Sequence, residues 1–272
     1  MEDLIRVDAA LAQRGLAQSR ERAQRMIAAG LVTVNGETVT KPARRVSDSD
    51  VLAVLGEDIP YVSRGGLKLE KALRAFDIDP AGLVCADIGA STGGFTDVLL
   101  QNGARRVYAV DVGSAQLAPK LLEDPRVTNC EHVNARSLSP ELFPERPILA
   151  VMDVSFISIR LILPALFDVL GPGGRAVVLV KPQFEAGRRE IGKHGVVSSQ
   201  AAHIHVLEAL LAFVPTLGWQ VNRLDFSPIC GGDGNLEFLA DLLPAARCEQ
   251  PFPAEDIPAL VRRAHTAMKE VR

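Results

Sequence analysis

Short apolar runs alternate with segments of helical spacing along most of the chain from about residue 83 onward. In the intervening segments apolar residues recur every three or four positions, which predicts helices, whereas the runs themselves predict buried strands. Strands that alternate with helices predict a parallel, doubly wound α/β sheet with right-handed crossovers. We expect its strands over 83–89, 106–112, 127–133, 148–154, 175–181, 219–225 and 236–242, with late helices near 200–217 and 254–270.

A smaller α+β pattern precedes this sheet and occupies residues 1–59. Two short segments, 7–14 and 19–29, predict helices, because Ser19 can serve as an N-cap and glycines follow both segments. The stretch LVTVNGETV alternates around Asn35-Gly36, the strongest short signal for a hairpin, and VSDSDVLAVLG predicts one more strand. We therefore expect a small domain at 1–59, a linker at 60–65 and a second domain at 66–272 that begins with a helix over 66–76.

Charge is unevenly distributed between these parts. The 272-residue chain has a formal net charge of −3, so no global positive charge indicates a nucleic-acid partner. Between Leu4 and Arg45, however, eight basic residues stand against three acidic ones. A clustered basic face supplies phosphate contacts, although a solvated charged surface has the same composition. The candidate RNA-binding residues are Arg6, Arg14, Arg20, Arg22, Arg25, Lys41, Arg44, Arg45 and Arg64.

Composition also restricts the compartment and the cofactors. The four cysteines form no C-x-x-C pair, so neither a zinc site nor a redox motif is indicated. The charged N-terminus lacks the apolar core of a signal peptide, and no apolar run approaches the roughly 20 residues of a membrane-spanning helix. We expect a cytoplasmic protein with no metal and no membrane partner.

A glycine-rich turn, DIGASTGGF, follows the first predicted strand of the sheet. Its G-x-x-x-G-G spacing differs from the G-x-G-x-x-G of dinucleotide-binding folds, and the second strand ends in an acid suited to ribose hydroxyls. S-adenosylmethionine has a ribose but no pyrophosphate, which fits both features, although an ordinary turn or an NAD site is also compatible. The candidate cofactor residues are Asp87, Gly89, Ser91, Gly93, Gly94, Phe95, Asp111, Asn134 and Asp153.

Four charged residues are expected at one edge of the sheet. Asp153 and Lys181 end predicted strands, Glu237 opens the last strand, and Lys68 lies on the helix before the first strand. In open α/β sheets the active site lies beyond the carboxyl ends of the strands. A lysine beside carboxylates can take the proton of a poorly acidic ribose hydroxyl or stabilise the alkoxide. Taken singly, each of these residues is equally compatible with a catalytic role and with an ordinary surface position.

The order of these residues together with DIGASTGGFTDVLL resembles the K-D-K-E tetrad of the FtsJ/RrmJ-type 2′-O-ribose methyltransferases. VSRGG-LKL, MDVSFIS, LVKPQFE and GNLEFL extend the likeness, and the whole chain resembles the TlyA family, an S4 RNA-binding domain fused to such a methyltransferase. The resemblance implies an S-adenosylmethionine-dependent enzyme that methylates cytidine 2′-hydroxyls in ribosomal RNA of the large subunit. The full-length N-terminal part favours both subunits. The resemblance also implies Lys181 as the general base, or as the group that steers the hydroxyl, supported by Lys68, Asp153 and Glu237.

Other functions compete with this interpretation. An RNA-binding or ribosome-assembly protein without catalysis would keep the basic domain but not the intact tetrad. Arg223-Leu224-Asp225 is similar to the R-L-D core of pseudouridine synthases, which however lack a glycine-rich cofactor loop. The TlyA family is also labelled haemolysin, and nothing in the sequence supports membrane lysis. The target nucleotide and the oligomeric state do not follow from the sequence.

Overall fold

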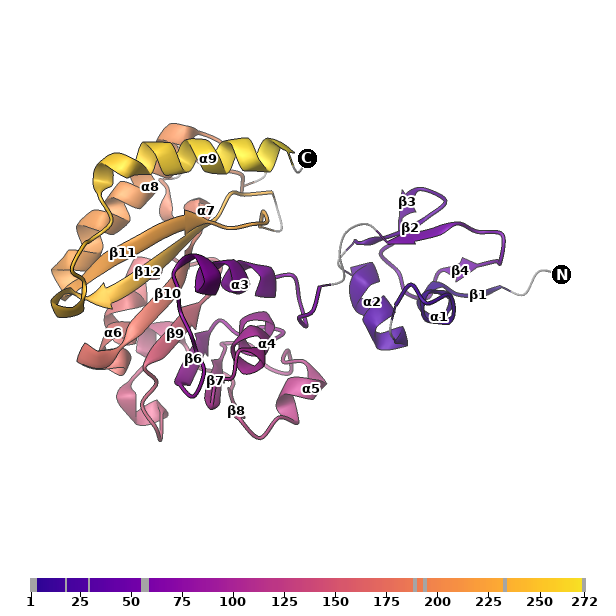
Figure 1. The fold of residues 1–272 in the computed structure, drawn as a ribbon, viewed down its shortest axis with the longest axis horizontal. Coiled ribbons are helices and arrows are strands. Elements are labelled where there is room, and N and C mark those ends of the chain that lie inside the picture. The colour runs from indigo at the N-terminus through magenta and orange to yellow at the C-terminus, as the bar shows by residue number, and fades with distance from the viewer. Residues whose placement is uncertain are drawn as a thin grey trace. The chain divides into compact units, whose positions relative to one another are not determined.

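A computed structural model describes residues 4–17, 19–28, 30–54, 59–187, 190–192, 195–231 and 234–270 (Figure 1). The chain divides into two compact units between Arg64 and Gly65. This division falls inside the segment expected to be a linker. Each unit has its own hydrophobic core, and each is described separately below.

The N-terminal unit packs two helices on short strands. A hairpin turn at Asn35 and Gly36, with φ values of 53° and 84°, joins β2 and β3 in the left-handed conformation that Asn-Gly favours. Strand β2 is central in a three-stranded antiparallel sheet, and β1 pairs with β4. Leu11 and Ile27 are fully buried between these elements. The elements are α1 (Val7–Gln13), α2 (Arg20–Ala28), β1 (Ile5–Arg6), β2 (Val32–Val34), β3 (Glu37–Thr38), β4 (Arg45–Val46) and β5 (Leu52–Val54).

The second unit contains a seven-stranded sheet in the order β11-β12-β10-β9-β6-β7-β8. Strand β12 is antiparallel to both of its neighbours, and the other described pairs are parallel. The order reverses at β6, whose neighbours are β7 and β9, so this strand marks the switch point at which such sheets bind ligands. The strands are β6 (Val84–Ile88), β7 (Arg106–Val110), β8 (Val127–Cys130), β9 (Leu149–Met152), β10 (Arg175–Val180), β11 (Trp219–Phe226) and β12 (Phe238–Pro244).

Helices cover both faces of this sheet. One face forms a continuous apolar core with α6, α8 and α9, in which Met152, Leu207 and Val261 are buried. Helix α3 precedes the first strand of the sheet and packs with α4 (Figure 1). The helices are α3 (Gly66–Ala75), α4 (Gly94–Gln101), α5 (Pro119–Leu122), α6 (Leu163–Leu170), α7 (Pro182–Glu185), α8 (Gln200–Phe213) and α9 (Ile257–Glu270).

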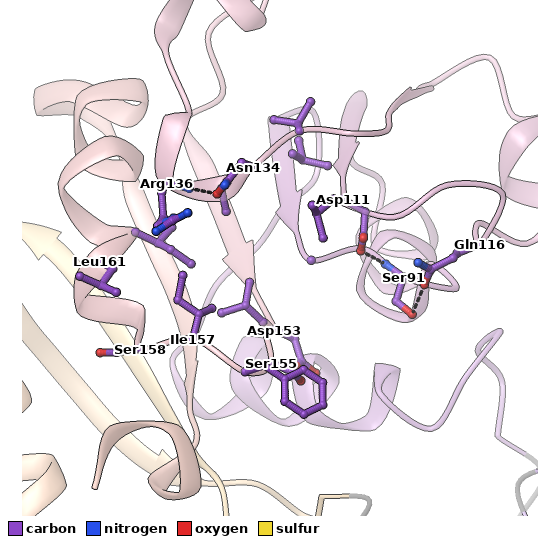
Figure 2. A pocket seen from close by; sticks show the side chains of 18 residues that line it. Ser91, Asp111, Gln116, Asn134, Arg136, Asp153, Ser155, Ile157, Ser158 and Leu161 are labelled. Atoms are coloured by element: carbon purple, nitrogen blue, oxygen red, sulfur yellow. Dashed lines mark hydrogen bonds between the residues drawn. The ribbon is translucent and has the colours of Figure 1, made fainter. Parts of the chain in front are cut away.

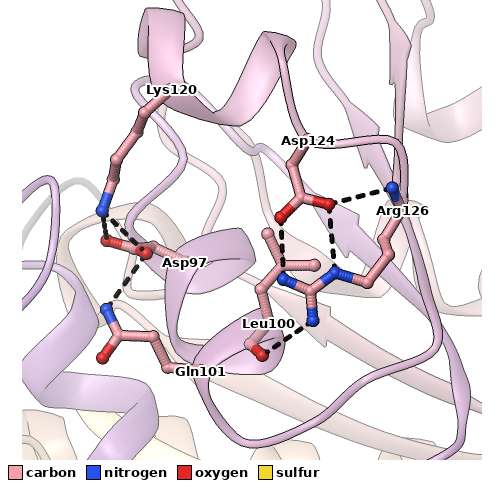
Figure 3. A network of polar contacts seen from close by, with 6 residues as sticks. All are labelled: Asp97, Leu100, Gln101, Lys120, Asp124 and Arg126. Carbon is pink, nitrogen blue, oxygen red and sulfur yellow. Dashed lines mark hydrogen bonds and ion pairs between the residues drawn. The ribbon is translucent and has the colours of Figure 1, made fainter.

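Polar contacts hold the segment after β7 against α4 (Figure 3). Lys120 contacts both carboxylate oxygens of Asp97, at 3.0 and 2.9 Å. Arg126 binds Asp124 and also donates to the backbone oxygen of Leu100. These contacts stabilise the outer wall of the glycine-rich turn.

By length and composition alone, the segment Gln200–Leu217 could cross a membrane. In the fold, this segment contributes α8, which packs on α9 and buries Val206, Leu207 and Leu210 in the core of the second unit. Its apolar composition therefore has a sufficient explanation in the packing of the sheet.

Candidate active site

A pocket of about 830 Å³ opens at the carboxyl ends of β6, β7, β8 and β9 (Figure 2). The loops that follow these four strands line it. Five of the nine predicted cofactor residues contribute to its wall: Gly89, Ser91, Asp111, Asn134 and Asp153. Its size matches the 300–1,000 Å³ of ordinary small-molecule sites. We call it the donor pocket.

Gly89 brings two loops of the donor pocket together. Its φ is +83°, and a Cβ atom at this position would lie 2.6 Å from the backbone oxygen of Asp153. No side chain fits in that space, so only glycine allows the turn after β6 to contact the end of β9. The glycine predicted to approach a ligand thus also fixes the position of Asp153.

The Asp111 carboxylate joins the first and second loops of the pocket. Its Oδ2 accepts from the backbone N–H of Ser91 at 2.8 Å, and its Oδ1 accepts from that of Gly113 at 2.7 Å. The Ser91 hydroxyl donates to Gln116, a lining residue that the sequence pattern did not indicate (Figure 2). Each carboxylate oxygen keeps a second acceptor site, so Asp111 remains suited to ribose hydroxyls.

Asp87 lies beneath the donor pocket rather than in its wall. Its side chain is fully buried, and its Oδ2 accepts from the backbone N–H and the hydroxyl of Thr96. Its Oδ1 has no hydrogen-bond partner among the described residues. The pKa of Asp87 is raised to about 7, chiefly by burial and also by the charges of Asp153 and Asp111, against the lowering effect of the Thr96 hydrogen bonds.

The expected ligand contacts of three further residues also need correction. Gly93, Gly94 and Phe95 are buried and do not line the pocket. A Cβ on Gly93 would lie 2.2 Å from a methyl carbon of Leu121, so this glycine permits packing of α5 on the turn. Within G-x-x-x-G-G, Gly93 therefore permits helix packing, whereas Gly89 permits a close backbone approach in the wall of the pocket.

Exposed apolar residues form part of the pocket wall, which the sequence analysis did not anticipate. Val112, Phe156 and Leu161 have relative exposures of 70%, 91% and 59%. Phe156 has a φ of +65°, a rare conformation for a bulky residue, and its ring lies 5.3 Å from that of Phe184. Apolar surface exposed around a pocket is typical of a ligand site.

A chain of alternating charges runs from the donor pocket across the sheet edge. Nζ of Lys181 lies 2.5 Å from Oδ1 of Asp153, and Nζ of Lys68 lies 3.3 Å from Oδ2 of the same carboxylate. Lys68 also lies 2.7 Å from Oε2 of Glu237. Lys181 donates to the Ser155 hydroxyl at 2.9 Å. The four residues proposed as a tetrad thus form one connected group.

Burial and neighbouring charges act in opposite directions on the pKa of Lys68. Burial opposes the charge on Lys68, but Asp153 and Glu237 outweigh this effect, so the pKa of Lys68 is raised. Lys68 therefore remains an ammonium and cannot accept a proton near neutral pH. Both lysines contact the Asp153 carboxylate, and only Lys68 also pairs with Glu237.

Glu237 is held by the turn that precedes β12. Its side chain is 2% exposed, and its backbone oxygen accepts from the N–H of Ser227. A Cβ on Gly231 would lie 2.6 Å from Oε1 of Glu237. Because β12 runs antiparallel to β10, its first residues meet the end of β10 at the same edge, as the sequence predicted.

Glu185, on α7, secures the loop that carries Ser155 and Phe156. Its carboxylate accepts from the Ser158 hydroxyl at 2.7 Å and from the backbone N–H of Ile159 at 2.8 Å. Burial raises the pKa of Glu185, and the Ser158 hydrogen bond opposes this. The loop after β9 and the residues after Lys181 are thereby joined.

In the N-terminal unit, a buried carboxylate organises part of the basic surface. Asp8 is fully buried and accepts hydrogen bonds from Arg6, Arg20 and Gln24. The Arg6 hydrogen bond and the other donors hold the pKa of Asp8 below its usual range, against the effect of burial. Arg6 and Arg20 keep 40% and 53% of their side chains exposed.

Two of the candidate RNA-binding arginines are held by backbone acceptors within the unit. Arg22 is buried and donates to the backbone oxygen of Tyr61, and Arg14 donates to the backbone oxygens of Asp50 and Ser47. Their guanidinium groups are occupied by backbone acceptors, which a helical pattern does not reveal. Lys41, Arg44, Arg45 and Arg64 are exposed, whereas the side chain of Arg25 lies outside the described residues.

The described part of the chain contains no group of three or more His, Cys, Asp or Glu side chains arranged to hold a metal ion. Asp153 and Glu237 are paired with lysines.

The sheet order, the donor pocket and the adjoining lysine–carboxylate chain define the second unit as a methyltransferase-type α/β domain. Residues 61–242 match the family described as FtsJ-like methyltransferase, and residues 5–52 match the S4 domain. The chain belongs to the FtsJ-like methyltransferase family.

Several relatives are similar over most or all of the chain's length. The chain is 44% identical to the 16S/23S rRNA (cytidine-2′-O)-methyltransferase TlyA of Mycobacterium tuberculosis, over 95% of this chain and 96% of that protein. It is 43% identical to Hemolysin A of Brachyspira hyodysenteriae, over 88% and 100%. A solved structure of a hemolysin candidate from Streptococcus thermophilus superposes with a TM-score of 0.79 at 48% identity, covering 100% of this chain and 99% of that one.

Proposed function

We propose that the protein transfers a methyl group from S-adenosylmethionine to the ribose 2′-hydroxyl of a cytidine in ribosomal RNA. The observation that carries this proposal is the position of Asp153. Its carboxylate lines the donor pocket and also contacts Lys181 at 2.5 Å, so donor and acceptor sites share one residue. Methyl transfer needs such adjacency, because the hydroxyl must approach the methyl group in line.

The donor pocket fits this cofactor. Asp111 and Ser91 offer polar groups suited to its ribose, Asn134 and the exposed Val112 lie where a base can bind, and Asp153 suits a cation. S-adenosylmethionine supplies a methyl group on a positively charged sulfonium. Asp111→Ala should weaken cofactor affinity by roughly 2–4 kcal/mol, since it removes two charge-assisted hydrogen bonds to the ribose hydroxyls of the cofactor. RNA affinity should be unchanged.

The residues on the acceptor side, where the ribose 2′-hydroxyl that receives the methyl group must lie, activate this hydroxyl. Lys181 takes the hydroxyl proton, or its ammonium stabilises the forming alkoxide. Asp153 orients Lys181, and Lys68, fixed by Glu237, holds Asp153 in place. Phe156, 91% exposed beside the pocket, can stack on a base that has left its helix.

The ribosomal substrate rests on both domains together. The exposed cations of the S4 unit suit the phosphates of folded RNA, and its sequence contains few aromatic residues for base stacking. The M. tuberculosis relative carries the name of a 16S/23S enzyme, which favours substrates in both subunits. Such a substrate implies a cytoplasmic location.

Methylation of purified subunits tests the proposal directly. Small and large subunits from a strain lacking the gene are incubated with the protein and labelled S-adenosylmethionine, and the product is mapped by mass spectrometry. The expected product is 2′-O-methylcytidine, absent with Lys181→Ala. Cofactor binding without any methylated RNA, from subunits or free ribosomal RNA, would contradict it and favour a non-catalytic RNA-binding role.

A further inference from the structure

A second hollow, of about 760 Å³, lies beside the edge strand β11. It is bounded by α3 through Lys71, by the end of β11 through Asp225 and Phe226, and by α9 through Arg262 and Arg263. None of these residues belongs to the donor pocket or to the lysine–carboxylate chain.

This hollow adjoins the acceptor side of the catalytic centre. Phe226 is the cross-strand partner of Phe238, the residue after Glu237, and the N–H of Ser227 donates to the backbone oxygen of Glu237. On α3, Lys71 lies one helical turn beyond Lys68. The sheet order β9-β10-β12-β11 puts the hollow three strands from Asp153, about 14 Å at the usual strand spacing, on the side away from the donor pocket.

The surface around the hollow carries excess positive charge. Arg262, Arg263 and Arg74 are exposed, and none forms an ion pair with another described residue. Lys71 lies 3.2 Å from Asp225, the one carboxylate among the lining residues, and 3.6 Å from the centre of the Phe226 ring. Burial lowers the pKa of Lys71, and Arg263 and Arg74 contribute, which indicates that these cations lie close together.

We propose that this surface, formed by Arg74, Arg262 and Arg263 and here called the α9 cationic surface, binds the phosphodiester backbone of the substrate RNA beside the target nucleotide. The inference rests on the proposed function and adds a second RNA-binding surface, independent of the S4 unit. Exposed guanidinium groups without carboxylate partners suit phosphate oxygens, which they can bind in pairs. Such contacts fix the register of the strand without reading its sequence.

Salt dependence of RNA binding tests the α9 cationic surface. The variant Arg262→Ala/Arg263→Ala is compared with Arg105→Ala/Arg106→Ala, which removes two arginines where β7 begins, on the far side of β6 from β11 and at the amino ends of the parallel strands. The slope of log Kd against log salt should fall by about 0.7 to 0.9 for each phosphate that the variant no longer neutralises. The control should keep the wild-type slope. Cofactor affinity and single-turnover transfer at saturating RNA should match wild type in both variants.

Each outcome separates the inference from the proposed function. If wild-type protein methylates RNA but the α9 variant keeps the wild-type slope, the surface is only solvated charge and the inference is overturned. If the α9 variant binds free RNA normally and loses affinity only for whole subunits, the partner is a ribosomal protein, which also overturns it. Absence of methylation by wild-type protein contradicts the proposed function itself.

Discussion

Nζ of Lys181 lies 2.5 Å from Oδ1 of Asp153, a residue that forms part of the donor-pocket wall. The two residues end neighbouring parallel strands, so their closeness follows from the pairing of β9 with β10. The lysine is 7% exposed, which limits competing water. In the proposed reaction, this pair is the point where the two substrates meet.

Removal of the Lys181 amino group should therefore affect chemistry rather than binding. We expect Lys181→Ala to lower single-turnover methyl transfer by a factor on the order of 100 to 10,000, the usual range for one acid–base group. Lys181→Arg should not restore activity, since guanidinium does not release its proton and has a different shape. Single-turnover rates at saturating RNA, with separate cofactor and RNA titrations, measure this. Near wild-type rates in Lys181→Ala would show that the tetrad is structural.

Lys68 should act on stability as well as activity. Lys68→Met leaves the 2% exposed Glu237 without its cation, and loss of one partner of a buried pair costs about 3–5 kcal/mol of unfolding free energy. Lys68→Met/Glu237→Gln should recover most of that stability and remain poorly active, because Asp153 still lacks its second lysine. Urea unfolding and transfer assays on the same proteins separate the two effects.

Lys120→Met provides the matched control for Lys68→Met. This lysine is 48% exposed and pairs with Asp97 on the outer wall of the glycine-rich turn. Asp97 is 5% exposed, but the half-exposed lysine lets water reach it once the side chain is shortened, and Gln101 still donates to it, so the loss should be smaller than for Lys68→Met. An equal loss of stability in both variants would argue against a special role for the buried pair.

The sequence placed four charged residues at one sheet edge, and the structure brings them together there, because strand ends follow from periodicity. Once the apolar runs place Asp153 and Lys181 at carboxyl ends, parallel pairing brings them together. The glycine-rich turn was harder, since ligand approach and helix packing both select glycine, and the difference between Gly89 and Gly93 appears only when β9 and α5 are in place.

Tertiary partners explain what the sequence pattern did not indicate. Arg22 lies on α2 and Arg14 directly follows α1, positions where an arginine normally faces solvent, but backbone oxygens at positions 61, 50 and 47 accept from them. Those acceptors come from distant parts of the chain and carry no side-chain signal. Phe156 was missed for a related reason, since its exposure depends on an uncommon positive φ that Phe alone does not indicate.

Exposed cations near the hairpin, rather than these structural arginines, should govern RNA affinity of the S4 unit. Lys41 and Arg44 border a shallow hollow, and Arg44 makes only a 3.5 Å contact with the exposed Glu37. Lys41→Ala/Arg44→Ala should leave folding intact and reduce the log–log salt slope by about 0.7 to 0.9 for each phosphate that is no longer neutralised.

Arg14→Ala provides the contrast for that variant. It should lower the thermal stability of the S4 unit, because the backbone acceptors of Asp50 and Ser47 lose their donors. A steeper loss of RNA binding in Arg14→Ala than in Lys41→Ala/Arg44→Ala, at temperatures where both are folded, would contradict the assignment.

Asp87 should produce a distinctive pH dependence of stability. Its pKa is raised from 3.8 to about 7 in the folded protein, chiefly by burial. Between about pH 4 and 7 the unfolded chain releases this proton while the folded protein keeps it, so the unfolding free energy should fall as pH rises through that window. Above pH 7 both states are ionised and the contribution becomes constant.

Asp87→Asn removes this titration and should flatten the pH dependence of the unfolding free energy between about pH 4 and 7, measured by urea unfolding at each pH.

The protonation of Asp87 should also report cofactor binding. Asp153 and Asp111 raise the pKa of Asp87 through their negative charge, so a cation bound beside them should lower it and expel the proton. Calorimetry of S-adenosylmethionine binding at about pH 6.5, in buffers of different ionisation enthalpy, should show proton release in wild type and less in Asp87→Asn. Equal proton release in both proteins would mean that another group responds to the cofactor.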